Sequence, residues 1–228
     1  MFTVLTLVKK RIRRAINSIR VKNKQKVFCI GRNKTGTTSV KAAFHELGYI
    51  IGEQDVAEHL FEQCFLESNY EPIIKYCQSA EVFQDVPFSF YQIIPHLDRA
   101  FPNSKFILTI RDTPEQWYQS FVKYYSKRSG VKDGVATYED LKSSTYVSKT
   151  FRAKFITQAH GTPHEDPFNK EILIEQYNEH IEYVKNYFKN RPNDLLIINI
   201  AQENAFKQFL AFIGKESKAT SFPWENKT

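Results

Sequence analysis

A short loop rich in glycine, basic and hydroxyl side chains follows the first apolar run of the chain. The run is residues 27–31 (VFCIG), and an amphipathic stretch follows the loop. A loop that opens a helix presents free backbone N–H groups and the positive end of the helix dipole to an anion. The pattern predicts a phosphate-binding loop, and the alternative is a basic turn that binds nothing. The loop consists of Arg32, Asn33, Lys34, Thr35, Gly36, Thr37, Thr38 and Ser39.

The position of the lysine separates this loop from that of the nucleotide triphosphatases. In their pattern, G-x-x-x-x-G-K-[ST], lysine directly follows the second glycine and the next hydroxyl binds magnesium. Here Thr37 follows Gly36, and Lys34 lies two residues before that glycine. The displaced lysine argues against an ATPase or a kinase. A P-loop kinase or nucleotidase remains the alternative enzyme within the same fold.

A second basic position follows another apolar run. Residues 105–110 (KFILTI) lead into Arg111, and Ser120 lies in the helical stretch that comes next. Arginine at the carboxyl end of a strand can donate two parallel hydrogen bonds to a phosphate, and a serine hydroxyl can add another. The two residues could therefore bind a second phosphate group. The alternative for Arg111 is a salt bridge to a nearby carboxylate such as Asp112.

These segments resemble the nucleotide-binding segments of the PAPS-dependent sulfotransferases, in their bacterial type. KTGTTS after the first strand is similar to the family's 5′-phosphosulfate loop. Residues 101–120 look like its 3′-phosphate segment, in which a strand ends in arginine and the next helix supplies a serine. Cytosolic members usually place that serine eight residues after the arginine, whereas Ser120 is the ninth and Gln119 the eighth. The resemblance continues through residues 169–200 and 222–228, so it covers nearly the whole chain after residue 26.

The resemblance implies that PAPS (3′-phosphoadenosine 5′-phosphosulfate) is the co-substrate and that no metal ion is needed. It assigns PAPS binding to the loop 32–39 together with Arg111 and Ser120. Lys34 would stabilise the negative charge that grows on the leaving group, adenosine 3′,5′-bisphosphate. No contact could be assigned to Asn226 or Lys227 in the tail.

Asp85 stands where the cytosolic sulfotransferases have a general base. Residues 83–87 read FQDVP, and the matching family segment is His-Leu-Pro, so the resemblance puts Asp85 in place of the histidine. A carboxylate within hydrogen-bond reach can accept the proton of an attacking hydroxyl. The expected reaction is in-line transfer of a sulfo group to a hydroxyl. The alternative is that Asp85 caps the next helix or orders the loop beside Pro87.

Other candidate residues predict less chemistry. His160 and His164 have the spacing of helical metal ligands, but Gly161 and Pro163 lie between them and no acidic pair is near, so a metal site is not predicted. The three cysteines, Cys29, Cys64 and Cys77, lack CxxC spacing and are expected to be buried free thiols. An aromatic group is interpreted as helix core rather than as the wall of an acceptor pocket. It consists of Trp117, Tyr118, Phe121, Tyr124 and Tyr125.

Short apolar runs that alternate with helical patterns predict an α/β fold. We expect a three-layer sandwich with a central, mostly parallel sheet, similar to the P-loop NTPases, that binds its ligand beyond the carboxyl ends of the strands. Helices are expected before Gly48, over residues 170–190 and over residues 201–213. Residues 129–168 interrupt the alternation and are interpreted as a lid or an acceptor-binding insertion. The predicted strands are residues 27–31, 49–51, 81–83, 105–110 and 194–200.

The charge of the chain is concentrated at its start. Residues 1–26 hold nine of the 32 basic residues and no acidic one, so the other 23 basic residues face 25 acidic ones. The predicted domain, residues 27–228, is therefore not a basic nucleic-acid binder. Residues 1–26 form a basic amphipathic extension that either contacts an anionic membrane or is solvated. The apolar start, residues 1–8, is too short to span a bilayer and lacks the order of a secretory signal, which predicts a cytoplasmic protein.

The acceptor has no readable motif. Carbohydrate, lipid and small-molecule hydroxyls all remain open, because the segment that is expected to shape the pocket, residues 129–168, shows no recognisable pattern. A rival of another class is a non-catalytic, membrane-associated nucleotide-binding protein that kept the phosphate loop.

Overall fold

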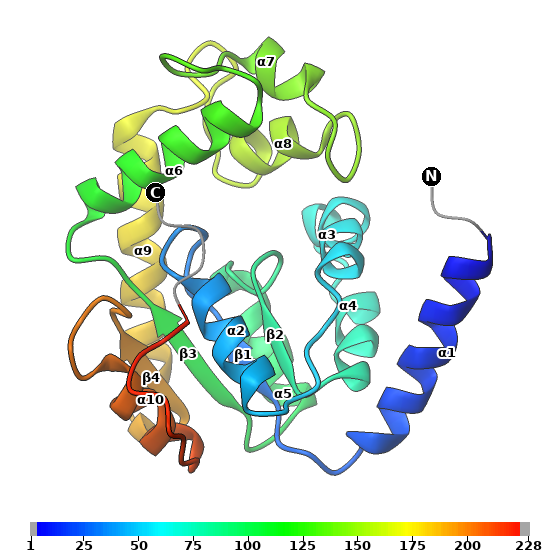
Figure 1. Ribbon diagram of the computed structural model, residues 1–228. Coiled ribbons are helices and arrows are strands. Elements are labelled where there is room, and N and C mark those ends of the chain that lie inside the picture. Colours follow the sequence, from blue (N-terminus) through cyan, green and yellow to red (C-terminus); the bar gives the residue numbers. More distant parts are fainter. Residues whose placement is uncertain (1–3, 224–228) are drawn as a thin grey trace.

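Four short parallel strands form the centre of the fold, and their order along the sheet is β2-β1-β3-β4 (Figure 1). The structure is a computed structural model, and it describes residues 4–223. Because β1 lies between two strands that come later in the chain, its carboxyl end is a switch point of the kind at which α/β proteins bind ligands. The strands are β1 (Val27–Cys29), β2 (Val82–Gln84), β3 (Lys105–Thr109) and β4 (Leu195–Ile198).

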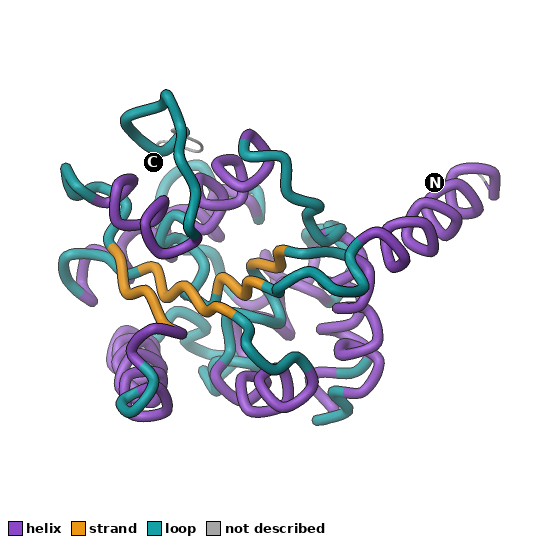
Figure 2. The backbone as a smooth tube through the Cα atoms, turned by 90° about the horizontal axis from the view of Figure 1, so that it is seen from below, coloured by secondary structure: helices purple, strands orange, loops and turns teal. Residues whose placement is uncertain are grey.

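Helices cover both faces of this sheet, which confirms the predicted α/β sandwich (Figure 2). One face packs against α2 (Thr37–Glu46) and α10 (Ala205–Ile213). The other face packs against a larger group of helices. These are α3 (Gln54–Gln63), α4 (Glu71–Tyr76), α5 (Ile94–Ala100), α6 (Pro114–Arg128) and α9 (Lys170–Phe188).

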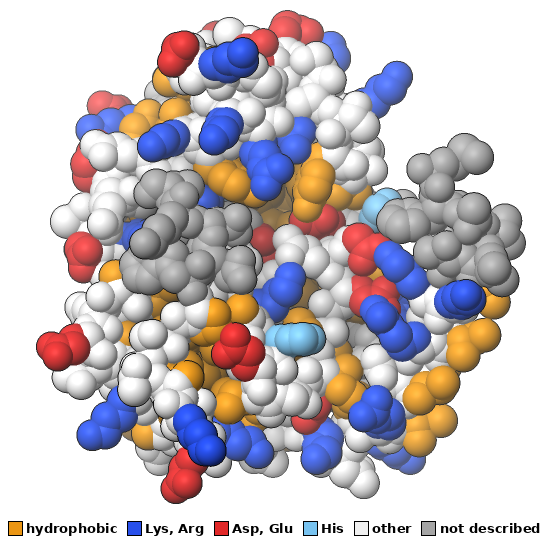
Figure 3. Space-filling model, viewed as in Figure 1, with side chains coloured by type: hydrophobic (Ala, Val, Ile, Leu, Met, Phe, Trp, Pro, Cys, Tyr) orange, Lys and Arg blue, Asp and Glu red, His pale blue; other side chains and the backbone are white. Residues whose placement is uncertain are grey.

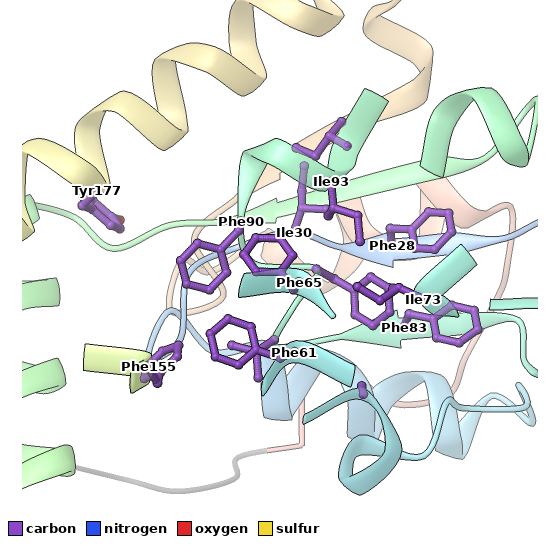
Figure 4. Packing of buried hydrophobic residues seen from close by; sticks show 14 of the residues in the cluster. Phe28, Ile30, Phe61, Phe65, Ile73, Phe83, Phe90, Ile93, Phe155 and Tyr177 are labelled. Atoms are coloured by element: carbon purple, nitrogen blue, oxygen red, sulfur yellow. The ribbon is translucent and has the colours of Figure 1, made fainter. Parts of the chain in front are cut away.

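Aromatic side chains fill the larger core layer (Figure 4). The ring of Phe28 in β1 lies 5.7 Å from that of Phe83 in β2 and 5.5 Å from that of Phe106 in β3, measured between ring centroids. Phe61 of α3 stacks on Phe90 at 5.7 Å. Alternate residues of each strand point to opposite faces, so the continuous apolar strands supply both layers.

Local signals explain where two of the long helices begin. Thr113 accepts a hydrogen bond from the backbone N–H of Gln116 at 3.1 Å, and Pro114 follows as the first residue of α6. Asn169 accepts one from the N–H of Ile172 at 3.1 Å and starts α9. Such caps satisfy backbone donors that have no partner within the helix.

Several predicted elements are shorter in the structure. Residues 49–51 contribute only an isolated bridge between Ile51 and Val82, because the chain turns into α3 at Gln54. Residues 201–204 form a turn, and α10 begins only at Ala205.

The segment 129–168 is more helical than its composition suggests. It contains α7 (Tyr138–Ser143), α8 (Phe151–Ala153) and a π-helical turn (Lys154–Gln158). Together with α6, these elements lie above the carboxyl ends of the strands (Figure 1). The same segment was predicted to form a lid or an acceptor-binding insertion, and this role stays a prediction.

The chain starts with α1 (Val4–Arg20), a basic helix at the side of the domain. Among the helices in residues 4–223, none is both long and apolar enough to cross a bilayer.

Candidate functional site

The loop after β1 has a backbone that only particular residues tolerate. Lys34 has a φ of 72° and Gly36 a φ of 102°, both in the left-handed region. A Cβ at Gly36 would lie 2.3 Å from Cδ1 of Ile200, so glycine is required there for space as well as for conformation. Thr37 is the first residue of α2, and the N–H groups at the very start of a helix lack partners within it, although that of Ser39 donates to the carbonyl oxygen of Gly36 at 3.0 Å. The loop therefore opens onto a helix N-terminus, as predicted.

Two predicted binding residues in this loop turn their side chains away from the cavity. The hydroxyl of Thr35 is buried and contacts the carbonyl oxygen of Arg32 at 2.6 Å and the hydroxyl of Thr109 at 2.5 Å. The guanidinium of Arg32 is buried over the ring of Phe90, 4.6 Å from its centroid, and burial lowers its pKa to about 10. Both side chains make contacts inside the protein that hold the loop in place. Only the backbone of these two residues can therefore contact a ligand.

Lys34 is a partly desolvated cation at the centre of the cavity. Its Nζ lies 4.1 Å from the ring centroid of Tyr124. Burial lowers the pKa of Lys34 to about 8, and the positive charges of Arg111 and Arg128 act in the same direction. A bound anion would raise the pKa of Lys34 again, because a nearby negative charge stabilises the charged form of the lysine.

Arg111 reaches the phosphate loop from the end of β3. Its Nε donates a hydrogen bond to the backbone carbonyl oxygen of Lys34 at 2.7 Å. Within residues 4–223, Arg111 takes part in no ion pair. Asp112 instead accepts a hydrogen bond from Asn199 at 2.6 Å. The alternative of an Arg111–Asp112 salt bridge is therefore not found.

The helix after β3 supplies both core and cavity residues. Trp117 is buried and donates from Nε1 to the carbonyl oxygen of Asn33 at 2.9 Å, which fixes the start of the loop. Phe121 is also core, whereas Tyr124 and Tyr125 line the cavity. Ser120 is half-buried on α6 and does not itself line the cavity, so its nucleotide-binding role stays a prediction.

Asp85 lies directly after β2 and lines the cavity next to the phosphate loop. Its carboxylate accepts hydrogen bonds from Nδ2 of Asn33, from Nε2 of Gln54 at 3.0 Å and from the backbone N–H of Val86 at 2.9 Å. Burial raises the pKa of this carboxyl group. Asp85 thus orders its own loop and faces the cavity at the same time, so the two roles considered for it are compatible.

Glu58 is a cavity residue that sequence reasoning missed. It is 5% exposed on α3 and accepts hydrogen bonds from Nε2 of Gln54 at 3.0 Å and from the hydroxyl of Tyr146 at 2.9 Å. Burial raises the pKa of Glu58 to about 7, against the effect of these hydrogen bonds. Gln54 donates to both Glu58 and Asp85, so one amide bridges two carboxyl groups. In the sequence, the only signal for this pair is the interval of four residues between Gln54 and Glu58, which makes them neighbours on a helix surface.

The phosphate loop, the two carboxyl groups and the cap above the sheet enclose one cavity. Its loop residues are Asn33, Lys34, Gly36, Thr37, Thr38 and Ser39, and the cap adds Tyr124, Arg128, Tyr146 and Arg152. In Figure 3, basic side chains gather on the upper rim of a hollow below α6 and α8, and acidic ones lie across it near α3. One cavity therefore brings cations, hydroxyl groups and carboxyl groups together.

The two histidines considered as metal ligands contact other protein groups, and the cysteines are free thiols. His160 is buried and donates from Nδ1 to the carbonyl oxygen of Phe155 at 2.8 Å, and the ring of His164 stacks on Tyr138 at 3.9 Å. No group of three or more His, Cys, Asp or Glu side chains suited to a metal ion occurs in the described part of the chain. Cys29 and Cys77 are buried free thiols as predicted, but Cys64 is only half-buried.

Fold and site together define an α/β protein whose first strand leads into a loop that opens a helix, at the switch point of a parallel sheet. A family model described as "Sulfotransferase domain" matches residues 26–228. The chain therefore belongs to the sulfotransferase family, a family of sulfo-group transferases, and the resemblance found in the sequence is confirmed. No curated protein matched the chain in sequence.

Proposed function

We propose that this protein transfers a sulfo group from PAPS to an acceptor hydroxyl and releases adenosine 3′,5′-bisphosphate. One observation carries the proposal: Arg111, in the loop after β3, and Lys34, in the loop after β1, meet through a 2.7 Å hydrogen bond at a single cavity that Asp85 also lines. Two basic residues at one cavity suit a nucleotide with phosphates at both the 5′ and 3′ positions of its ribose.

The residues present fit such a donor. The loop backbone, Lys34, Thr37 and Thr38 would hold the 5′-phosphosulfate, because the N-terminus of α2 and the desolvated lysine both line the cavity. Arg111 would hold the 3′-phosphate with its Nη atoms, since Nε is engaged by the loop. Ser120 is proposed to assist it from α6.

The carboxyl groups would handle the proton of the acceptor. When bound, PAPS supplies a sulfo group on a good leaving group. Asp85 accepts the proton as the acceptor oxygen bonds to sulfur and the bond from sulfur to the bridging oxygen breaks, and Lys34 stabilises the charge on that oxygen. Glu58 keeps Gln54 oriented toward Asp85.

The N-terminal helix fits a peripheral contact with an anionic membrane on the cytoplasmic side. Val8, Ile12, Ile16 and Ile19 lie on one face of α1 and are 45%, 55%, 52% and 79% exposed. Figure 3 shows hydrophobic side chains along the outer edge of α1. An exposed apolar stripe flanked by cations is the signature of a helix that lies in the membrane interface.

The opposite face of α1 ties it to the domain. Lys10 pairs with Asp55 at 2.5 Å, and Arg13 and Arg14 pair with Glu53 at 3.0 and 3.6 Å. Asp55 and Glu53 lie at the start of α3, the helix that carries Glu58. These pairs leave the apolar face outward, and Lys9 and Arg11 are also exposed beside it.

Calorimetric titration tests the donor. Adenosine 3′,5′-bisphosphate is expected to bind tightly without magnesium, and ATP weakly with or without it. Tight binding of ATP with magnesium would overturn the proposal in favour of a kinase or nucleotidase. Labelled PAPS is then offered with a panel of hydroxyl acceptors. Bisphosphate binding without transfer to any acceptor would favour a non-catalytic nucleotide-binding protein.

A further inference from the structure

Two arginines lie on the cavity wall away from the phosphate loop. Arg128 ends α6 and is exposed at the rim, whereas Arg152 belongs to α8 and is 8% exposed. The guanidinium of Arg128 lies 5.4 Å from the ring centroid of Tyr124, and that of Arg152 lies 5.1 Å from that of Tyr146. Both arginines thus line the cavity over aromatic rings.

The charge of Arg152 has no acidic partner in the described chain. Neither a hydrogen bond nor an ion pair of its guanidinium occurs within residues 4–223. The nearby acidic groups are engaged elsewhere: Glu62 pairs with Lys154 at 3.3 Å, and Glu58 accepts from Tyr146. Burial lowers the pKa of Arg152, and the positive charge of Arg128 lowers it further, so the two guanidiniums repel each other. A buried cation without a partner is costly unless a ligand supplies the opposite charge.

The position of this pair favours the acceptor as the source of that charge. The donor's phosphates are already matched by the loop 32–39 and by Arg111. Arg152 comes instead from the segment 129–168, whose Tyr146, Phe151 and Phe155 also line the cavity. The same cavity is lined by Asp85, where the acceptor hydroxyl would give up its proton.

We propose that Arg128 and Arg152 form an anion-binding subsite, so that the acceptor carries a carboxylate, phosphate or sulfate group in addition to its hydroxyl. The inference rests on the proposed sulfotransferase function and names its substrate class. The anionic group would pair with the two guanidiniums, the body of the acceptor would pack on the rings of Phe151 and Phe155, and the hydroxyl would face Asp85.

Matched acceptor pairs test the subsite. Each pair has an anionic and a neutral member: 4-hydroxyphenylacetate with its amide, glucuronate with glucose, and glycerol 3-phosphate with glycerol. Transfer from labelled PAPS is measured, and each compound is also titrated into the full-length protein saturated with adenosine 3′,5′-bisphosphate. We expect the anionic member of at least one pair to be preferred by tenfold or more.

Variants then assign the preference to the arginines. Arg152→Gln and, at the exposed rim, Arg128→Gln should each reduce the preference severalfold while bisphosphate affinity stays unchanged, and Arg152→Lys should restore part of it. Lys149→Gln removes an exposed charge from the same segment and should change nothing. If Arg152→Gln does not fold, the preference for the anionic acceptor in Arg128→Gln and Arg152→Lys still tests the subsite.

Equal binding, or no binding, of both members of every pair would overturn the subsite. An unchanged preference in the variants would do the same. A fall in bisphosphate affinity equal to the fall in acceptor binding would assign the two arginines to the donor instead. Failure of the proposed function itself looks different, because the protein would then either not bind the bisphosphate or bind it and transfer no sulfo group to anionic and neutral acceptors alike.

Discussion

Nε of Arg111 donates a hydrogen bond to the carbonyl oxygen of Lys34 across 2.7 Å, although 77 positions separate the two residues in the chain. The contact arises because β1 and β3 are parallel neighbours, with Cys29 opposite Ile107, so the loops after them meet at one edge of the sheet. It leaves both Nη atoms of Arg111 for another acceptor. The phosphate loop and the second basic position therefore lie at one site, as the proposed binding of a single nucleotide requires.

Removing the Arg111 side chain should abolish recognition of the 3′-phosphate. In Arg111→Ala, affinity for adenosine 3′,5′-bisphosphate should fall roughly 10- to 150-fold, corresponding to about 1.5–3 kcal/mol for hydrogen bonds to a charged group. Affinity for adenosine 5′-monophosphate, which lacks that phosphate, should change little. Calorimetry of both nucleotides measures the difference, and Arg99→Ala on the exposed side of α5 is the control. An equal loss for both nucleotides would show that Arg111 only supports the loop.

Lys34 should make catalysis and donor binding sensitive to alkaline pH. Lys34→Ala is expected to lower turnover about 100- to 1000-fold, the effect of losing one positioned electrostatic group of about 3–4 kcal/mol. Lysine is cationic below its pKa, and that pKa is about 8 here, so bisphosphate affinity should weaken as pH rises through 8. The arginine side chain in Lys34→Arg should stay cationic over this pH range, so the loss of bisphosphate affinity near pH 8 should disappear. Lys123→Ala, an exposed change on α6, serves as control, and a near-normal rate in Lys34→Ala would exclude the residue from the mechanism.

Glu58 should make the protein less stable as pH rises from about 4.5 to 7. Its folded pKa of about 7 exceeds the ordinary value of 4.5, so the folded state binds more protons in that window and the free energy of unfolding falls with pH. The shift corresponds to about 3 kcal/mol, all of it lost above pH 7. Urea unfolding at a series of pH values should show a flatter profile for Glu58→Gln. Glu46→Gln, exposed at the end of α2, is the control, and an unchanged slope in Glu58→Gln would contradict the assignment.

Much of the binding loop could be predicted from the sequence, because its signals are local. An apolar strand, a glycine with positive φ and a helix that begins directly afterwards all lie within residues 27–46. Arg111 could be predicted equally well, because it follows a buried strand. Their convergence then followed from the geometry of parallel strands alone.

The rest of the site depends on contacts between distant segments. Arg32 was expected to face the ligand, but the ring of Phe90 and the carbonyl oxygen of Gln176, 144 positions away, hold its guanidinium in the core. The hydroxyl of Tyr146, 88 positions later, donates a hydrogen bond to the buried carboxyl group of Glu58. No spacing within the helices predicts such packing, which is why Glu58 and the two cap arginines emerge only in three dimensions.

The outward face of α1 should bind anionic membranes. The double variant Ile12→Asp/Ile16→Asp should weaken sedimentation with vesicles containing phosphatidylserine at least about tenfold, because full burial of one isoleucine contributes roughly 1.5–3 kcal/mol and the new carboxylates repel the lipid. Wild-type binding should fall with salt and be weak on phosphatidylcholine alone. Val135→Asp places the same change at another exposed apolar residue, 57% exposed, and should have no effect. Equal binding to both kinds of vesicle would show that the basic residues of α1 do not contribute to membrane binding. Absence of binding to either kind would overturn the membrane contact and favour docking of α1 on an acidic protein surface. Sulfo transfer to a water-soluble acceptor should survive in the double variant, since the apolar stripe faces away from the ion pairs that join α1 to α3.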